Sequence, residues 1–413
     1  MGESERLGFR AEYGKKPQRM ARHASCKGAD TTMEPTMKTP VALASLTLAF
    51  VLGCSGAPES PTPEGTDMEL EGTVASALTP CDASSRGRTF FTRNVNLGFA
   101  VEPVLGASSI EEVPGLVAEA WAQMEKNDFR ARAALLAGEI ASLSPDAIGL
   151  QEAAIVRRFS ASGAAPVEFD YLAILQSALA ARGLRYVAVV VQNDTDVTVP
   201  MFAGFDPSGA PILDGVQIID RDVVLVREGV RTSRPESARF QVGIPVALGD
   251  APVEVVRGWA SVVVHTSEGP FRFVNTHLED LVPEVQLAQA SELLGIVNSD
   301  PLPVVLVGDL NARSNTPTYA LFTGAGFVDS WAQANPRDPG FTCCQDVDLK
   351  KTLPFTERID YVLARTPGRP ARIRGQVKAR IVGANPRVRT ASGLWASDHA
   401  GLGASFAMPR LGN

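Results

Sequence analysis

Two polar residues whose side chains could take part in catalysis follow the most apolar run of the chain. In "VVLVGDLNARSNTPTY", residues 304–319, Asp309 and Asn311 come directly after the run Val304–Val307 and Gly308. On extended backbone, two side chains two residues apart point the same way. For this pair alone, an Asx-type turn in which both side chains bond nearby backbone is the simpler interpretation. A chemical role therefore depends on whether other polar groups reach the same place.

Similar polar groups lie at or beside the ends of apolar runs in other parts of the chain. They are Asn94, Glu152, His277, Asp360, and Asp398 with His399. Each alone could be structural: a helix-start carboxylate, a satisfied core histidine, the ion partner of a nearby arginine or an exposed turn. Their recurrence at so many strand ends instead predicts one shared site.

The chemistry of this set is that of phosphate ester hydrolysis. Carboxylate and amide oxygens with a few imidazoles suit a hard divalent cation such as Mg²⁺ or Mn²⁺ better than zinc. With such a cation, an aspartate or histidine can take a proton from water while amides hold the developing phosphoryl oxygens. The sequence has no G-x-S-x-G, no P-loop and no G-x-G-x-x-G at a strand-to-helix junction. Serine hydrolases, nucleotide switches and dinucleotide enzymes are therefore disfavoured.

The spacing of apolar residues predicts interleaved helices and strands that would position these groups. Helices are expected over residues 116–143, 171–182, 283–297 and 316–326. Strands are expected over residues 88–99, 184–194, 221–228, 304–307, 357–365 and 397–406. A short strand is expected to end at Gln151-Glu152, and two more strands joined by a turn are expected within 258–279. This order favours a layered α/β (α+β) sandwich.

Composition sets the broad class. The chain has 413 residues, of which 45% are hydrophobic, so it can bury a sizeable core in one large domain or two smaller ones. Its 39 basic and 46 acidic residues give a net charge of −7. The absence of a basic excess counts against a tight, non-specific nucleic-acid binder but does not exclude a nuclease.

The N-terminal part is expected to direct export. Residues 37–53 have the pattern of a lipoprotein signal peptide, ending in a lipobox before Cys54, the expected acylated residue. Residues 1–36 are then interpreted as an upstream start artefact, residues 54–84 as a Pro/Glu/Ser-rich tether and residues 85–408 as the catalytic domain. The protein is thus expected to be exported and lipid-anchored to a bacterial membrane or cell surface.

Three further cysteines could form a disulfide if the protein is exported. They are Cys81 and the adjacent Cys343 and Cys344. A disulfide is expected either between Cys81 and one of the pair or within the pair, and the spacing does not choose. A zinc site is not expected, because no C-x-x-C or histidine cluster accompanies them.

Six motifs carry a resemblance to a known family. In order, they are "TRNVNLG", "PDAIGLQE", "FVNTHLE", "VGDLNARSNTPTY", "ERIDYVL" and "SDHAGL". This series resembles the endonuclease/exonuclease/phosphatase superfamily, which includes pancreatic-type deoxyribonucleases, abasic-site nucleases, neutral sphingomyelinases and inositol polyphosphate phosphatases. It covers roughly residues 88–406. The resemblance implies a four-layer sandwich of two packed mixed β-sheets flanked by helices, with the active site at one sheet edge.

The resemblance also implies a role for each residue. The metal ligands would be Asn94, Glu152 and Asp398. The catalytic set would be His277, Asp309, Asn311, Asp360 and His399, in which Asp360 fixes the tautomer of His399 and raises its pKa. Asn275 and Arg221 would bind substrate, although for Arg221 an ion pair with Asp220 or Asp222 is an equal alternative. Whether Asp309 or His399 is the general base stays open.

The implied activity is hydrolysis of phosphodiesters with Mg²⁺ or Mn²⁺ by a monomer that needs no protein partner. A nuclease-like substrate, DNA or RNA, is favoured over a phospholipid head group in a sphingomyelinase or phospholipase C-like reaction, or over an inositol phosphate. A non-enzymatic surface-binding lipoprotein is the remaining alternative. One departure from the deoxyribonuclease branch is "QNDTDVTVP", which has Asp194 and Asp196 where that branch has a glutamate supporting the equivalent of His277.

Overall fold

The computed structural model describes residues 87–248, 251–368, 372–373 and 375–408. The expected signal peptide, the tether, Cys54 and Cys81 lie outside these residues. Within them, no helix is both long and apolar enough to span a membrane.

The first of two large β-sheets contains strands from both ends of the described chain. Its members are β1 (Arg88–Asn94), β2 (Ala147–Gln151), β3 (Ile155–Phe159), β4 (Val167–Asp170), β5 (Tyr186–Phe205), β6 (Pro211–Arg227), β15 (Lys378–Val382) and β16 (Gly401–Phe406). Their order is β15-β16-β1-β2-β6-β3-β4, and β5 pairs with β6. Strands β1 and β2 are parallel while the other pairs are antiparallel, so the sheet is mixed.

The second large sheet is formed by the middle of the chain. Its strands are β7 (Arg231–Arg239), β10 (Gly258–Thr266), β11 (Gly269–His277), β12 (Val304–Asp309), β13 (Val328–Asp329) and β14 (Asp360–Arg365), in the order β13-β14-β12-β11-β10-β7. Strands β8 (Ile244–Leu248) and β9 (Ala251–Val255) form a separate hairpin.

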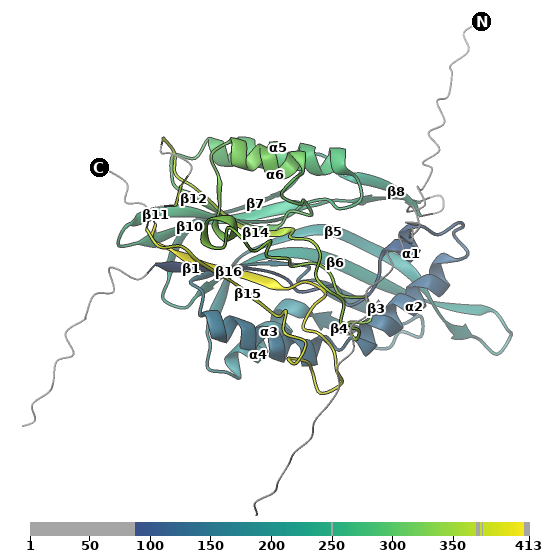
Figure 1. Ribbon diagram of the computed structural model, residues 1–413. Helices are drawn as coiled ribbons and strands as arrows, with labels where there is room; N and C mark the ends of the chain where they lie inside the picture. Colours follow the sequence, from purple (N-terminus) through teal and green to yellow (C-terminus); the bar gives the residue numbers. More distant parts are fainter. Residues whose placement is uncertain (1–86, 249–250, 369–371, 374, 409–413) are drawn as a thin grey trace, which may run out of the picture. The chain divides into compact units, whose positions relative to one another are not determined.

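Helices cover the outer faces of both sheets (Figure 1). They are α1 (Glu102–Leu105), α2 (Val113–Lys126), α3 (Phe129–Leu143), α4 (Tyr171–Ala180), α5 (Pro283–Asn298), α6 (Pro317–Gly324) and α7 (Ser330–Ala334). One core joins α2, α3 and α4 to the first sheet, and another joins α5 and α6 to the second. Between the sheets lies a third core, in which Phe90 packs against Phe271, Phe273 and Phe406. The expected four-layer sandwich of two mixed sheets is therefore confirmed.

The register of the strands brings the polar ends together. In the parallel pair β11 and β12, His277 lies opposite Asp309, and in the antiparallel pair β12 and β14, Asp309 lies opposite Asp360. Asn94 ends β1 opposite Gln151, directly before Glu152. Because the pleat and pairing fix these positions, residues far apart in the sequence reach one edge of the sandwich.

Some expected elements were wrong in extent. The helix expected over 116–143 is two helices, since Asp128 caps α3 by accepting a hydrogen bond from the Ala131 amide. The Asn127 side chain leaves the helix to donate to the carbonyl oxygens of Gly98 and Val347. Capping and buried amide bonds thus outweigh continuous apolar periodicity at this point.

The strands β5 and β6 are much longer than the expected 184–194 and 221–228. They form one hairpin of 20- and 17-residue strands. The polar stretch "QNDTDVTVP" reads as a break, but its residues alternate between buried and exposed positions of β5. Strand β7 was not expected, because "RTSRPESAR" is polar and contains Pro235. It is an edge strand, where proline and charge are tolerated.

Candidate active site

Asp309 is the centre of the cluster of polar side chains. Its Oδ2 accepts a hydrogen bond from Asn94 Nδ2 at 3.2 Å and lies 3.6 Å from His399 Nδ1 and 3.8 Å from His277 Nε2. All four side chains are buried, and they come from β1, β11, β12 and the segment before β16. The structure therefore unites four of the residues that the sequence singled out. Their individual roles remain predictions.

His399 forms a buried ion pair with Asp360. The ring Nδ1 donates to Asp360 Oδ2 at 3.0 Å. Burial lowers the pKa of His399, but the carboxylates of Asp360, Asp309 and Asp398 outweigh it and hold this pKa well above its usual range. The ring is therefore an imidazolium near neutral pH, with its Nδ1 proton directed at Asp360.

His277 has the opposite electrostatic environment. Burial, and then the positive charges of Arg257 and His399, hold its pKa well below the usual range, so the ring is neutral. Its Nδ1 lies 3.0 Å from Arg257 Nη1, which can only donate. Asn311 Nδ2, also a donor, lies 3.1 Å from Nε2, so two donors face the single lone pair of the neutral ring. The charged guanidinium is the stronger donor, which favours the ring proton on Nε2, on the side of Asp309.

Asn311 has an unusual backbone conformation. Its φ of 49° lies in the left-handed region. Its Nδ2 donates to the Leu278 carbonyl oxygen at 2.9 Å and lies 3.1 Å from His277 Nε2, while its backbone amide donates to Asp309 Oδ1. Such strain persists only where the surroundings impose it, and it clusters at functional sites.

Glu152 also has a left-handed backbone, with φ of 59°. Its Oε1 accepts from Asn94 Nδ2 at 2.7 Å and its Oε2 from the Leu97 amide at 2.7 Å. Burial, followed by the charges of Asp398 and Asp220, raises the pKa of Glu152 to about 8. Asn94 Oδ1 accepts a hydrogen bond from the Asn96 amide. Asn94 therefore contacts Glu152 through its NH₂ group and not through its oxygen.

These carboxyl groups fit a divalent cation. Burial and then the Asp360 charge raise the pKa of Asp309 to about 7, and Asp360 Oδ1 is buried without a hydrogen-bond partner among the described residues. Atoms of Asp309, Asp360 and His399 lie within 4.8 Å of one another. Because the His399 ring is protonated, the carboxyl oxygens of the two aspartates are the free donors of this group. Crowded acidic oxygens that are costly to ionise alone are the donor set that a hard cation stabilises.

Arg221 and Asn275, the expected substrate-binding residues, are occupied inside the fold. Arg221 Nε donates to the Ala153 carbonyl oxygen at 2.7 Å, and its Nη2 pairs with Asp170 Oδ1 at 2.5 Å, so neither adjacent aspartate is its ion partner. Asn275 is fully buried. Its Nδ2 donates to the Leu150 carbonyl oxygen, and its Oδ1 accepts from Gln151 Nε2. Both side chains join β6 or β11 to the segment that carries Glu152.

Arg257 is the principal site residue that the sequence did not indicate. Besides contacting His277, it lies 3.4 Å from Asp220 Oδ2 and 3.2 Å from Asp280 Oδ1. It immediately precedes β10, twenty positions before His277, in "VEVVRGWAS", where no polar pattern marks it. The only available signal was the pairing of β10 with β11, which sets the start of β10 beside the end of β11.

An acidic group lies next to this arginine. Burial, and then the charges of neighbouring aspartates, raise the pKa values of Asp194 and Asp222 well above their usual range. Asp194 thus lies in the field of Asp220 and Arg257, while Nδ1 of the His277 ring contacts this arginine rather than an acid.

Cys343 and Cys344 form a disulfide with each other, one of the pairings left open by the sequence. Each sulfur lies 3.9 Å from His399 Nε2. The pair therefore contacts the face of the imidazolium opposite Asp360.

Comparisons with known proteins address the fold and the family. The family described as "Endonuclease/Exonuclease/phosphatase family" matches residues 94–399. Similar solved structures include TDP2 from D. rerio with a single-strand DNA product, at 17% identity and TM-score 0.46 over 78% of this chain and 100% of that one. A mannosyl-6-phosphatase from Bacteroides thetaiotaomicron is 16% identical with TM-score 0.45, again over 78% and 100%. No curated protein sequence is significantly similar to this chain.

Proposed function

Because this chain belongs to the endonuclease/exonuclease/phosphatase family, whose members hydrolyse phosphoester bonds, we propose that it is a metal-dependent phosphodiesterase using water as the nucleophile. The observation that carries the proposal is the convergence of Asn94, His277 and His399 on Asp309 within 4 Å. Two oppositely tuned histidines beside a carboxyl group are suited to acid and base roles in one site.

The electrostatic environment favours Asp309 over His399 as the general base. The imidazolium of His399 already holds its proton and cannot accept another, whereas a carboxyl with a pKa of about 7 can take a proton from water near neutrality. His399 then supplies positive charge to the phosphate. The Nε2 proton of His277 faces the same space and can bond a phosphoryl or leaving oxygen.

A divalent cation, Mg²⁺ or Mn²⁺, bound by Glu152 and Asp398 would neutralise charge on the phosphoryl oxygens. Asn94 holds Glu152 and Asp309 in place by donating to both. The remaining positive charge comes from Arg257, which also fixes the His277 tautomer. We further propose that the protein is exported and anchored through Cys54. Surface labelling of intact cells that carry the protein or its Cys54→Ala variant would test this, because only the protein with Cys54 should stay bound to the cells.

Hydrolysis assays test the proposal directly. The purified protein should cleave bis(p-nitrophenyl) phosphate with Mg²⁺ and lose this activity in EDTA. Asp309→Ala and His399→Ala should each lower kcat by about 100-fold or more, because each removes a group that acts on the reacting atoms. The matched control is His265→Ala, since His265 lies at the end of β10 away from Arg257 and bonds Ser233 of β7. Unchanged turnover in either site variant would refute the assignment.

Plasmid DNA and sphingomyelin identify the substrate in the same assay. The sequence favours a nuclease-like activity, and metal-dependent nicking of plasmid DNA would support it. Cleavage of sphingomyelin alone would point to a phospholipase C-like reaction. A folded protein silent on all three substrates would favour a narrow phosphomonoesterase or a binding protein.

A further inference from the structure

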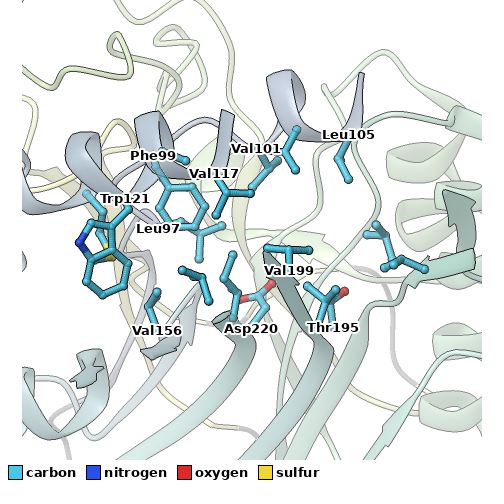
Figure 2. A pocket seen from close by; sticks show the side chains of 18 of the residues that line it. Leu97, Phe99, Val101, Leu105, Val117, Trp121, Val156, Thr195, Val199 and Asp220 are labelled. Atoms are coloured by element: carbon cyan, nitrogen blue, oxygen red, sulfur yellow. The ribbon is translucent and has the colours of Figure 1, made fainter. Parts of the chain in front are cut away.

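An apolar cavity adjoins the candidate active site. It lies between helices α1 and α2 and the strands β5 and β6, and its volume is about 140 Å³ (Figure 2). Apolar side chains form most of its wall, among them Leu97, Phe99, Val117, Trp121, Val156 and Val199. An engineered apolar cavity of about 150 Å³ in another protein takes up benzene, so a space of this size can hold a hydrocarbon group.

The cavity wall is shared with the catalytic residues. Asp220 and Arg257 also line it, and Arg257 Nη1 lies 3.0 Å from His277 Nδ1. Leu97 also lines the cavity, and its backbone amide donates to Glu152 Oε2. A group bound in the cavity would therefore lie beside a phosphoester held at Glu152 and His277. Such a group is most simply part of the substrate molecule itself.

The lining selects hydrocarbon over polar groups. Polar side chains in the lining are few. Asp220 and Arg257 pair with each other, and Thr195 Oγ1 donates to the Val256 carbonyl oxygen. Trp121 adds one buried Nε1 donor that has no partner among the described residues. A nucleobase placed here would lose hydrogen bonds to water without replacing them. A chain of methylene groups has no such cost and gains by leaving water.

We propose that this cavity binds the hydrocarbon part of an amphiphilic phosphodiester whose phosphate lies at Asp309 and His277. The proposal rests on the phosphodiesterase function and names its substrate class. It differs from the nuclease-like substrate that the sequence favours. Arg257, between the cavity and His277, marks the boundary between the apolar and the anionic parts of the substrate.

A series of alkyl p-nitrophenyl phosphates tests the proposal with the intact protein. From methyl to butyl to octyl, kcat/KM should rise by roughly fourfold per methylene until the cavity is full, the factor expected for burying one methylene group. A thymidine p-nitrophenyl phosphate diester provides the nucleic-acid comparison. A flat alkyl series, or a thymidine ester better than the octyl ester, would overturn the proposal.

A cavity-filling variant locates the effect. Ala120 on α2 lines the cavity, whereas Ala122 on the same helix does not. Ala120→Phe should remove most of the gain from the longer chains and leave the methyl ester unchanged, while Ala122→Phe should keep the full series. A full series in a folded Ala120→Phe variant would place the chain elsewhere and refute the cavity as its site.

A binding measurement tests the cavity proposal independently of the proposed phosphodiesterase function. Octyl phosphate and methyl phosphate are compared by calorimetry, which needs no turnover. If no ester is hydrolysed, the phosphodiesterase function fails, and tighter binding of octyl phosphate would still support the cavity. If the methyl ester is hydrolysed but both phosphates bind equally, the cavity proposal fails and the function stands.

Discussion

The pairing of His399 with Asp360 controls the charge of the site at the scale of single residues. Because the Asp360 carboxylate is the main source of the raised pKa of His399, Asp360→Asn should lower that pKa by on the order of one unit or more. If the imidazolium is the active form, the alkaline limb of the kcat/KM profile should move to lower pH. Asp196→Asn, on the exposed face of β5, is the matched control. Identical profiles for the Asp360 variant and the wild type would contradict this role.

Substitutions at Arg257, which is half-buried, and at Arg221, which is buried, should have different effects on catalysis and stability. Arg257→Met removes the donor to His277 Nδ1, frees the ring to change tautomer and should lower kcat by on the order of 100-fold. Arg221→Met removes bonds to Ala153 and Asp170 and should instead cost about 2 kcal/mol of stability, with kcat nearly unchanged in the folded protein. Paired kinetics and urea unfolding distinguish the two. A raised KM in a stable Arg221 variant would restore its expected contact with substrate.

Most catalytic candidates could be identified from the sequence because each ends an apolar strand. Asp309 follows Val304–Val307, and His277 ends the apolar strand β11. Arg257 could not be identified, because its importance comes from a neighbour twenty positions later and from no local pattern. Asn275 was given a substrate role for its place in a motif, although its amide is fully used between the sheets.

At the scale of elements, the two sheets approach each other closely at Gly149. A Cβ added at Gly149 of β2 would lie 2.3 Å from Asn275 Oδ1 and 2.5 Å from Val307 Cγ2. Gly149→Ala should therefore destabilise the fold by about 1–3 kcal/mol through overpacking. Gly115→Ala in α2 meets no atom within 4 Å and should be neutral or stabilising. Urea unfolding measures both, and equal midpoints would contradict the tight approach of the sheets.

Element boundaries were harder to predict than element types, for physical reasons. The strands around the site are apolar on both faces and stand out, whereas β7 is a polar edge strand and resembles a loop. The sequence predicts too short a β5–β6 hairpin, because its outer part buries only alternate residues and lacks a continuous apolar run. The break between α2 and α3 depends on the Asn127 amide, whose partners Gly98 and Val347 are distant in sequence.

At the scale of the whole molecule, the buried acids link stability to pH. Glu152 and Asp309, with pKa values of about 8 and 7, hold protons in the metal-free folded state at pH 6. In the unfolded chain both ionise at about pH 4. The folded state therefore binds more protons than the unfolded state in between. Their contribution to stability is complete below about pH 4 and is lost as the pH rises through 7 and 8.

The same protons compete with a bound cation, so metal affinity should depend strongly on pH. Raising the pH from 6 to 8 should tighten Mn²⁺ or Mg²⁺ binding by about tenfold or more, because the cation no longer has to displace a proton from Glu152. Calorimetry in buffers of different ionisation enthalpy counts the protons released. Glu152→Gln should weaken binding, reduce the proton release and raise the Mg²⁺ concentration needed for turnover, whereas Glu119→Gln on the exposed side of α2 should change none of these. Affinity independent of pH, with no proton released, would show that Glu152 does not bind the metal and would place the cation elsewhere on the protein.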